Sequence, residues 1–96
     1  MAIQSFASQD FERFYREGKA PRRAGWAGVS RIVMRKMDML DYADRLSDMN
    51  SPPGNRLEAL RGDLRGLHSI RVNDQWRIVF AWTESGPSGV DVRDYH

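Results

Sequence analysis

The chain has 96 residues, of which 41% are hydrophobic and 29% charged, with a net charge of +2 at pH 7. This length allows one compact core, so we expect a single domain over residues 1–96, and the composition excludes a disordered chain. The absence of cysteine excludes disulfides and thiolate chemistry. We expect no metal and no cofactor, because His68 and His96 form no metal-binding pattern.

The start of the chain, MAIQSFASQDF, lacks the basic region and apolar stretch of a signal peptide. No apolar run approaches the ~18 to 20 residues that span a bilayer. We therefore expect a cytoplasmic protein with no membrane partner.

The basic residues are strongly biased toward arginine. Only Lys19 and Lys36 are lysines among the 15 basic residues, although the sequence pI is about 9.4. Arginine holds phosphate through two parallel hydrogen bonds, which indicates a phosphate-bearing partner. A GC-rich genome would produce the same bias without any such function.

Two helices are predicted in the first half. Residues 3–6 can form a short strand, after which Ser8 is a candidate cap for a helix that ends at Gly18. A second helix is expected from about Ala24 or Val29 to about Leu46. Its apolar stripe has helical spacing, with Met34 and Met39 off the stripe and facing a partner or the rim of the core. The stripe consists of Val29, Ile32, Val33, Met37, Leu40 and Ala43.

The segment NSPPGN at 50–55 breaks any helix, and everything after it has the pattern of strands and turns. Helices followed by strands predict an α+β fold, with two N-terminal helices on one face of a small twisted antiparallel sheet. The other face should then be open. The expected strands are 56–60, 67–72, 76–82 and 90–95, with SGPSG as the last hairpin loop.

Strand alternation places two arginines on the open face. Ile78, Phe80 and Trp82 form the buried set, so Arg77 points the other way, as does Arg71 across the hairpin. Adjacent arginines repel unless they share an anion or pair with Asp74, Asp91 or Asp94.

The stretch PPGNRLEALRGDLRGLHSIRVNDQWRIVFAW and the ending VDVRDYH resemble the HigB-type branch of the RelE/ParE toxin superfamily. The resemblance implies a microbial-ribonuclease-like fold and a bacterial type II toxin that cuts translated mRNA in the ribosomal A site. It also implies a cognate helix-turn-helix antitoxin. The partners expected from it are therefore the ribosome, its mRNA and the antitoxin.

The resemblance maps the family's basic positions onto Arg61, Arg71 and Arg77, with Tyr95 and His96 completing the site. We expect Arg71, Arg77, Tyr95 and His96 to be catalytic, and Arg61 and Arg65 to bind substrate phosphate. Arg61 stands where many relatives carry lysine, and Glu58 where some carry histidine, which puts an additional base near residue 58 in doubt.

In RNA cleavage the ribose 2′-hydroxyl attacks the adjacent phosphorus and the 5′-oxygen leaves. Arg71 and Arg77 could hold the negative charge that develops on the phosphate. His96 is the candidate acid, because an imidazole titrates near ~6.5. Tyr95 could stack on a base or contact the ribose.

Two alternatives to an endoribonuclease stay open. A ParE-like toxin would bind DNA gyrase without nuclease chemistry, and a degenerate toxin would keep only its antitoxin-binding function. Among residues outside the site, His68 is expected at the surface or in a turn. Trp82 is expected in the core, and Trp26 and Trp76 are expected in the core or at its rim.

Overall fold

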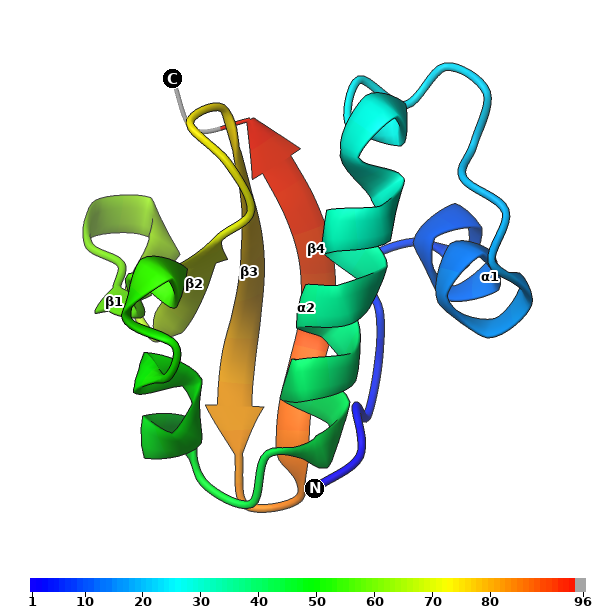
Figure 1. Cartoon of the computed structure of the whole chain (residues 1–96). Helices are drawn as coiled ribbons and strands as arrows, with labels where there is room; N and C mark the ends of the chain where they lie inside the picture. The colour runs from blue at the N-terminus through cyan, green and yellow to red at the C-terminus, as the bar shows by residue number, and fades with distance from the viewer. Residues whose placement is uncertain (95–96) are drawn as a thin grey trace.

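The computed structural model describes residues 1–94 and has a layer of helices on an antiparallel sheet, with the second helix in front of the sheet and the first to its right in the view of Figure 1. Both helices cover the same face of the sheet, which confirms the predicted α+β architecture. No helix in the described range is long and apolar enough to cross a membrane. The helices are α1 (Gln9–Glu17) and α2 (Ser30–Tyr42), with 3₁₀ turns η1 (Ala27–Val29), η2 (Leu46–Asn50), η3 (Pro53–Asn55) and η4 (Gly62–Leu64).

The sheet has the order β1-β2-β3-β4, and all pairs are antiparallel. Its strands are β1 (Glu58–Ala59), β2 (Leu67–Arg71), β3 (Trp76–Thr83) and β4 (Gly86–Asp94). The prediction of strands and turns after residue 55 is confirmed, with a 3₁₀ turn at residues 62–64. The strand expected at 56–60 was too long, because β1 has only two residues.

The ends of α1 follow from local chemistry, as predicted. The Ser8 hydroxyl accepts a hydrogen bond from the Phe11 backbone N–H at 3.1 Å, which satisfies one of the free donors at the helix start. At the other end, Gly18 adopts a left-handed conformation with φ 81°, and its N–H bonds to the Phe14 carbonyl at 2.7 Å.

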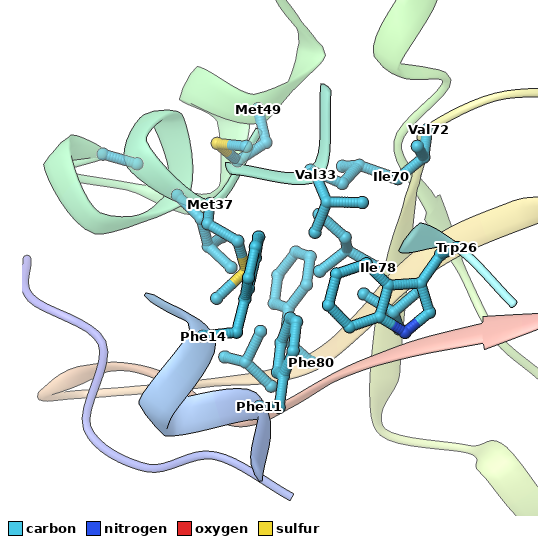
Figure 2. Packing of buried hydrophobic residues seen from close by; sticks show 14 residues of the cluster. Phe11, Phe14, Trp26, Val33, Met37, Met49, Ile70, Val72, Ile78 and Phe80 are labelled. Carbon is cyan, nitrogen blue, oxygen red and sulfur yellow. The ribbon is translucent and has the colours of Figure 1, made fainter. Parts of the chain in front are cut away.

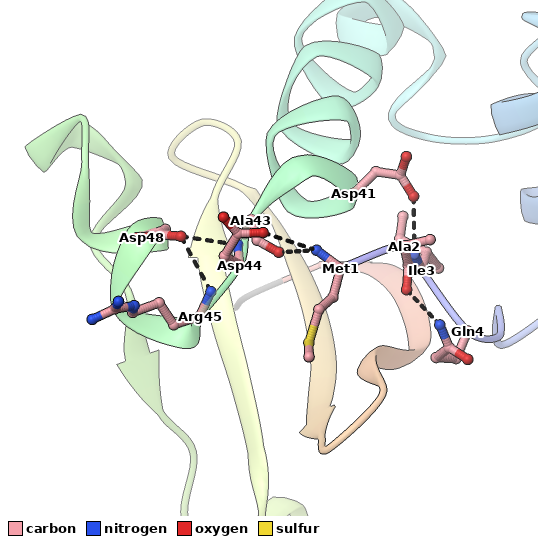
Figure 3. A network of polar contacts seen from close by, with 9 residues as sticks. All are labelled: Met1, Ala2, Ile3, Gln4, Asp41, Ala43, Asp44, Arg45 and Asp48. Carbon is pink, nitrogen blue, oxygen red and sulfur yellow. Dashed lines mark hydrogen bonds and ion pairs between the residues drawn. The ribbon is translucent and has the colours of Figure 1, made fainter.

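The second helix ends four residues earlier than expected, because Ala43 turns into an extended conformation. The carboxylate of Asp48 then accepts the backbone N–H groups of Asp44 and Arg45, which stabilises the start of η2 (Figure 3). The Ile3 N–H donates to Asp41 near the end of α2 at 2.9 Å. Aspartate side chains thus accept hydrogen bonds from backbone N–H groups at the end of α2 and in the segment that follows it.

The core lies between the helices and the sheet (Figure 2). Four residues of the predicted apolar stripe, in α2 and just after it, are buried. Val29 and Ile32 are half-buried and pack against the core. Met34 and Met39 are also half-buried and packed on the core, so they lie at its rim and not on an exposed surface. The buried stripe residues are Val33, Met37, Leu40 and Ala43.

The last hairpin is tighter than predicted. Its turn is at residues 84–85, and the glycine-containing segment that was expected as a loop belongs to β4. The pairing shifts register between Val79 and Ala81, opposite Gly89, whose φ is 61°. Glycine adopts this conformation without a steric penalty, so the strand continues through a β-bulge.

The N-terminal segment runs along β4 without forming a regular strand. Phe6 makes one parallel bridge with Val90, and the Gln4 N–H donates to the Pro87 carbonyl at 2.7 Å. The predicted strand at 3–6 was therefore wrong in extent, although the segment does pair with the edge of the sheet. These bonds cover part of the edge of β4, which would otherwise expose backbone groups.

Candidate functional site

Three arginines lie side by side across the face of the sheet that points away from the helices. Arg71 of β2 pairs in register with Arg77 of β3, and Arg77 pairs with Arg93 of β4. Side chains directly opposite in an antiparallel pair point to the same face, with Cβ atoms about 5 Å apart. We call these three residues the arginine row. The pairing of Arg71 with Arg77 confirms the prediction that they are neighbours.

Sequence reasoning missed Arg93 as a member of this site. The signal was present in the alternation of VDVRD, where Val90 and Val92 are buried and Arg93 points the other way. Strand alternation alone does not identify the cross-strand partner, because the β-bulge beyond Val79 changes the register of the hairpin.

Arg77 is the most enclosed of the three, with 6% of its surface exposed. Its Nε donates to the Ser69 hydroxyl at 2.8 Å, and its Nη2 donates to the carbonyls of Arg56 at 2.6 Å and Ser69 at 3.3 Å. Ser69 and Val79 on the same face are buried as well. The expectation of an open face was therefore wrong at its centre, because the segment before β1 reaches over it.

The two outer arginines are accessible and pair with acids on their own side of the sheet. Arg71 bonds to Asp74, which is 99% exposed, and Arg93 lies 3.4 Å from Asp91. Of the three aspartates predicted to pair with Arg71 or Arg77, only Asp74 does so within residues 1–94, because Asp91 pairs with Arg93 and Asp94 accepts from Gln75 at 3.0 Å. Exposed pairs of this kind contribute little to stability, so an incoming anion can replace them.

Beside the arginine row, Glu58 pairs in register with Ser69 and therefore lies on the same face. It lines a cavity of about 610 Å³ together with Ala59, Leu60 and Arg61. This places the expected phosphate-binding Arg61 next to a carboxylate at the edge of the site. The sequence had left an additional base near residue 58 in doubt. In the structure the carboxylate of Glu58 lies on the same face as the arginine row.

The other predicted site residues are not all assembled in the described chain. Arg65 is exposed just after η4 and is not among the described residues that line the cavity. Tyr95 and His96 lie outside the described residues. Among residues 1–94, no group of three metal-binding side chains is close enough together to hold an ion.

His68 does not occupy the surface or turn position expected for it. It lies within β2 on the helix-facing side, and its ring stacks on Phe80 with centroids 6.2 Å apart. Its Nδ1 is buried, with no hydrogen-bond partner among the described residues.

The tryptophans are packing residues. Trp26 is buried against Phe11 and Phe14, and Trp76 is half-buried against the core, as predicted. Trp82 is half-buried at the edge of the core, so its assignment to the interior was too strong.

The arrangement suits an anion with several oxygens. Three guanidinium groups lie in a row on one face, two of them beside aspartates, and Arg77 is held in place by hydrogen bonds from its Nε and Nη2. Guanidinium groups bind phosphate oxygens bidentately, and partial burial strengthens that attraction.

The fold, two helices on a four-stranded antiparallel sheet, is similar to that of solved structures that include a bacterial toxin. A YoeB/ParE toxin from Agrobacterium tumefaciens aligns over 100% of both chains, with a TM-score of 0.54 and 20% identity. YafQ from E. coli strain BL21(DE3) aligns over 96% of this chain and 90% of its own, with a TM-score of 0.53 and 14% identity. At these identities the likeness concerns the fold.

The sequence relatives define the family. The family model described as the RelE-like toxin of the type II toxin-antitoxin system HigB matches residues 4–96. Toxin HigB-1 of Vibrio cholerae serotype O1 is 40% identical over 84 residues, which cover 88% of this chain and 86% of the relative. The chain belongs to the HigB-like family of RelE-like toxins, the toxins of type II toxin-antitoxin systems.

Proposed function

We propose that this toxin is a ribosome-dependent endoribonuclease that cleaves mRNA during translation. The observation that carries the proposal is the arginine row, Arg71, Arg77 and Arg93, on the helix-free face beside Glu58. The row has the enclosed guanidinium of Arg77 at its centre, with the more accessible Arg71 and Arg93 on either side. A phosphodiester in a transition state has the charge and geometry that such a row complements.

In the proposed reaction the ribose 2′-hydroxyl attacks the adjacent phosphorus and the bond to the 5′-oxygen breaks. The products are a 2′,3′-cyclic phosphate and a 5′-hydroxyl. Arg71 and Arg77 bind the non-bridging oxygens, on which negative charge increases in the transition state. Arg61 and Arg65 contact flanking phosphates, and Arg93 extends the arginine row along the message.

Two proton transfers complete the reaction. Glu58 is the carboxylate on the same face as the arginine row, and we assign it the acceptance of the 2′-hydroxyl proton. His96 protonates the leaving 5′-oxygen, and Tyr95 contacts the ribose or a base; the family resemblance implies that both belong to the site. Each well-placed proton-transfer group contributes about 10²- to 10⁴-fold to the rate.

The partners in this proposal are the ribosomal A site, the message and a cognate helix-turn-helix antitoxin, and the site of action is the cytoplasm. Membership of a toxin-antitoxin family supports the antitoxin. A solved YoeB–YefM complex from Staphylococcus aureus, with a TM-score of 0.54 and 19% identity, has a fold in common with this chain.

The test is a cell-free translation reaction with purified protein, in which mRNA 5′ ends are mapped by primer extension. We expect cuts that require ribosomes and that are lost in Arg77→Ala, Arg71→Gln and a chain lacking His96. Circular dichroism and thermal unfolding of each variant separate loss of chemistry from loss of fold, which matters most for the enclosed Arg77.

Arg13→Gln is the matched control, because Arg13 is an exposed arginine of α1 on the opposite side of the molecule. It removes the same charge and should leave the cuts unchanged. Intact message with wild-type protein would contradict the nuclease proposal. Gyrase supercoiling in the presence of the protein would then test the ParE-like alternative.

A further inference from the structure

Asn55 of the NSPPGN segment is completely buried, although its side chain is polar. Its Nδ2 donates to the carbonyls of Met49 at 3.2 Å and Ser51 at 3.3 Å. Its Oδ1 accepts a hydrogen bond from the ammonium of Lys36 on α2. Only an amide side chain can make all three of these hydrogen bonds. An aspartate would lose the two bonds that Nδ2 donates, and a leucine would lose all three.

These bonds hold the turn that follows η2. The Asn55 N–H bonds to the Pro52 carbonyl at 2.9 Å and the Arg56 N–H to the Pro53 carbonyl at 3.1 Å. Arg56 then adopts a left-handed conformation, with φ 47° and ψ 54°. Among residues 1–94 it is the only non-glycine residue with a positive φ. Such a conformation is unfavourable for arginine and persists only where the surrounding bonds enforce it.

The strained residue presents its carbonyl to the centre of the arginine row. The Arg56 oxygen accepts from Arg77 Nη2 at 2.6 Å, the shortest of the hydrogen bonds given above for that guanidinium. In Figure 1 the green segment from η2 to η3 lies by β1 and β2, at the edge of the sheet away from β4. A continuous series of bonds therefore runs from Lys36 through Asn55 and the Arg56 turn to Arg77.

The pKa of Lys36 shows that this series of bonds lies close to the arginine row, because Arg71 influences it. Burial lowers the pKa of its ammonium below the ordinary value of 10.5, and the positive charges of Arg35 and Arg71 lower it further. A charged group is retained there although its surroundings disfavour the charge. Its bond to Asn55 is the compensating interaction.

We propose that Asn55 is a positioning residue for the phosphate clamp, and that with Lys36 it fixes the Arg56 turn whose carbonyl orients the Arg77 guanidinium. The inference rests on the proposed nuclease function and deepens it. Misplacing a reacting group by about 1 Å costs on the order of 10²-fold in rate. Asn55 thus acts on the reaction through Arg77 and not by contact with RNA.

The test combines side-chain NMR with kinetics on Asn55→Asp, which keeps the shape of the side chain and removes both donors. Hydrogen exchange of the Arg77 Nε–H in protein labelled with ¹⁵N-arginine measures how firmly the guanidinium is held. We expect exchange about 5- to 10-fold faster than in wild type. In ribosome-dependent cleavage, kcat should fall about 10- to 100-fold, with KM for programmed ribosomes changed less than about 3-fold.

Asn50→Asp is the matched control, because Asn50 is exposed at the end of η2 and receives the same substitution. It should leave both measurements at wild-type values. Lys36→Met keeps both Nδ2 bonds of Asn55 and removes the ammonium, so a smaller change in the same direction is expected. This second variant keeps the proposal testable if Asn55→Asp does not fold.

Unchanged Arg77 exchange in the folded variants overturns the proposal, as does faster exchange with wild-type kcat. A wild-type protein that cleaves no message overturns the nuclease function instead. In that case the exchange measurement still decides whether Asn55 orients Arg77, so the two failures are distinguishable.

Discussion

At the scale of single residues, the guanidinium of the buried Arg77 and the Nδ1 atom of the half-buried His68 differ in whether their buried nitrogens are hydrogen-bonded. Arg77 has hydrogen bonds to the hydroxyl and carbonyl of Ser69 and to the carbonyl of Arg56. His68 has a buried Nδ1 with no partner among the described residues. A buried acceptor without a donor costs roughly 1 to 3 kcal/mol. Arg77 is thus supported by its surroundings, whereas His68 is a local cost to stability.

The substitution His68→Phe should therefore stabilise the fold. Phenylalanine keeps a ring against Phe80 and removes the unpaired nitrogen, so the free energy of unfolding should rise by about 1 kcal/mol. For a domain of this size that corresponds to a melting temperature about 4 to 8 °C higher. His68→Ala is the comparison, because it also removes the ring and should lower the melting temperature. A lower melting temperature for His68→Phe would contradict this account.

At the scale of elements, the start of η2 depends on one carboxylate. Asp48 accepts the backbone N–H groups of Asp44 at 2.9 Å and Arg45 at 3.1 Å (Figure 3). These two bonds lower the pKa of the Asp48 carboxyl below its ordinary value of 3.8. The same turn connects α2 to the segment that carries Asn55.

Because the folded-state pKa of Asp48 is depressed, the stability it contributes is present above the unfolded-state pKa and is lost as pH falls through the folded value. Asp48→Asn should therefore lower the melting temperature at pH 7, and the difference from wild type should shrink below pH 4. Thermal unfolding of both proteins from pH 7 to pH 3 measures it. A difference independent of pH would mean that the charge of Asp48 is not responsible. Asp63→Asn is the control for an exposed aspartate.

At the scale of the whole molecule, the sheet separates two surfaces with different functions. One face is covered by α1 and α2 and forms the apolar core (Figures 1 and 2). The other face carries the arginine row. Like charges held together in the folded state are released from one another by unfolding, so they destabilise the free protein. A bound polyanion would remove this cost.

A short DNA oligonucleotide, which lacks the 2′-hydroxyl and cannot be cleaved by the proposed reaction, should raise the melting temperature. At ten times its Kd the stabilisation is about 1.4 kcal/mol. The increment should shrink at high salt and in Arg71→Gln and Arg93→Gln, because both variants remove charge from the row. Arg13→Gln should retain it. An increment equal in all variants would show that the oligonucleotide binds elsewhere.

Patterns within a few residues were enough to predict much of this molecule. The Ser8 cap, the Gly18 end and the apolar stripe of α2 each depend on interactions within a turn or two of the helix, and strand alternation correctly put Arg71 and Arg77 together. The motifs around residues 52–62 and 69–78 identified the family, which the comparisons confirm.

Interactions between distant segments decided the rest. Arg93 joined the row only through the register of β4, and Glu58 only through its pairing with Ser69. The enclosure of Arg77 depends on a carbonyl 21 residues away, and the burial of Asn55 on a lysine 19 residues away. A linear sequence does not display such contacts, because they depend on a bulge, a strained turn and the packing of α2 beside the sheet, which form only when the whole chain folds.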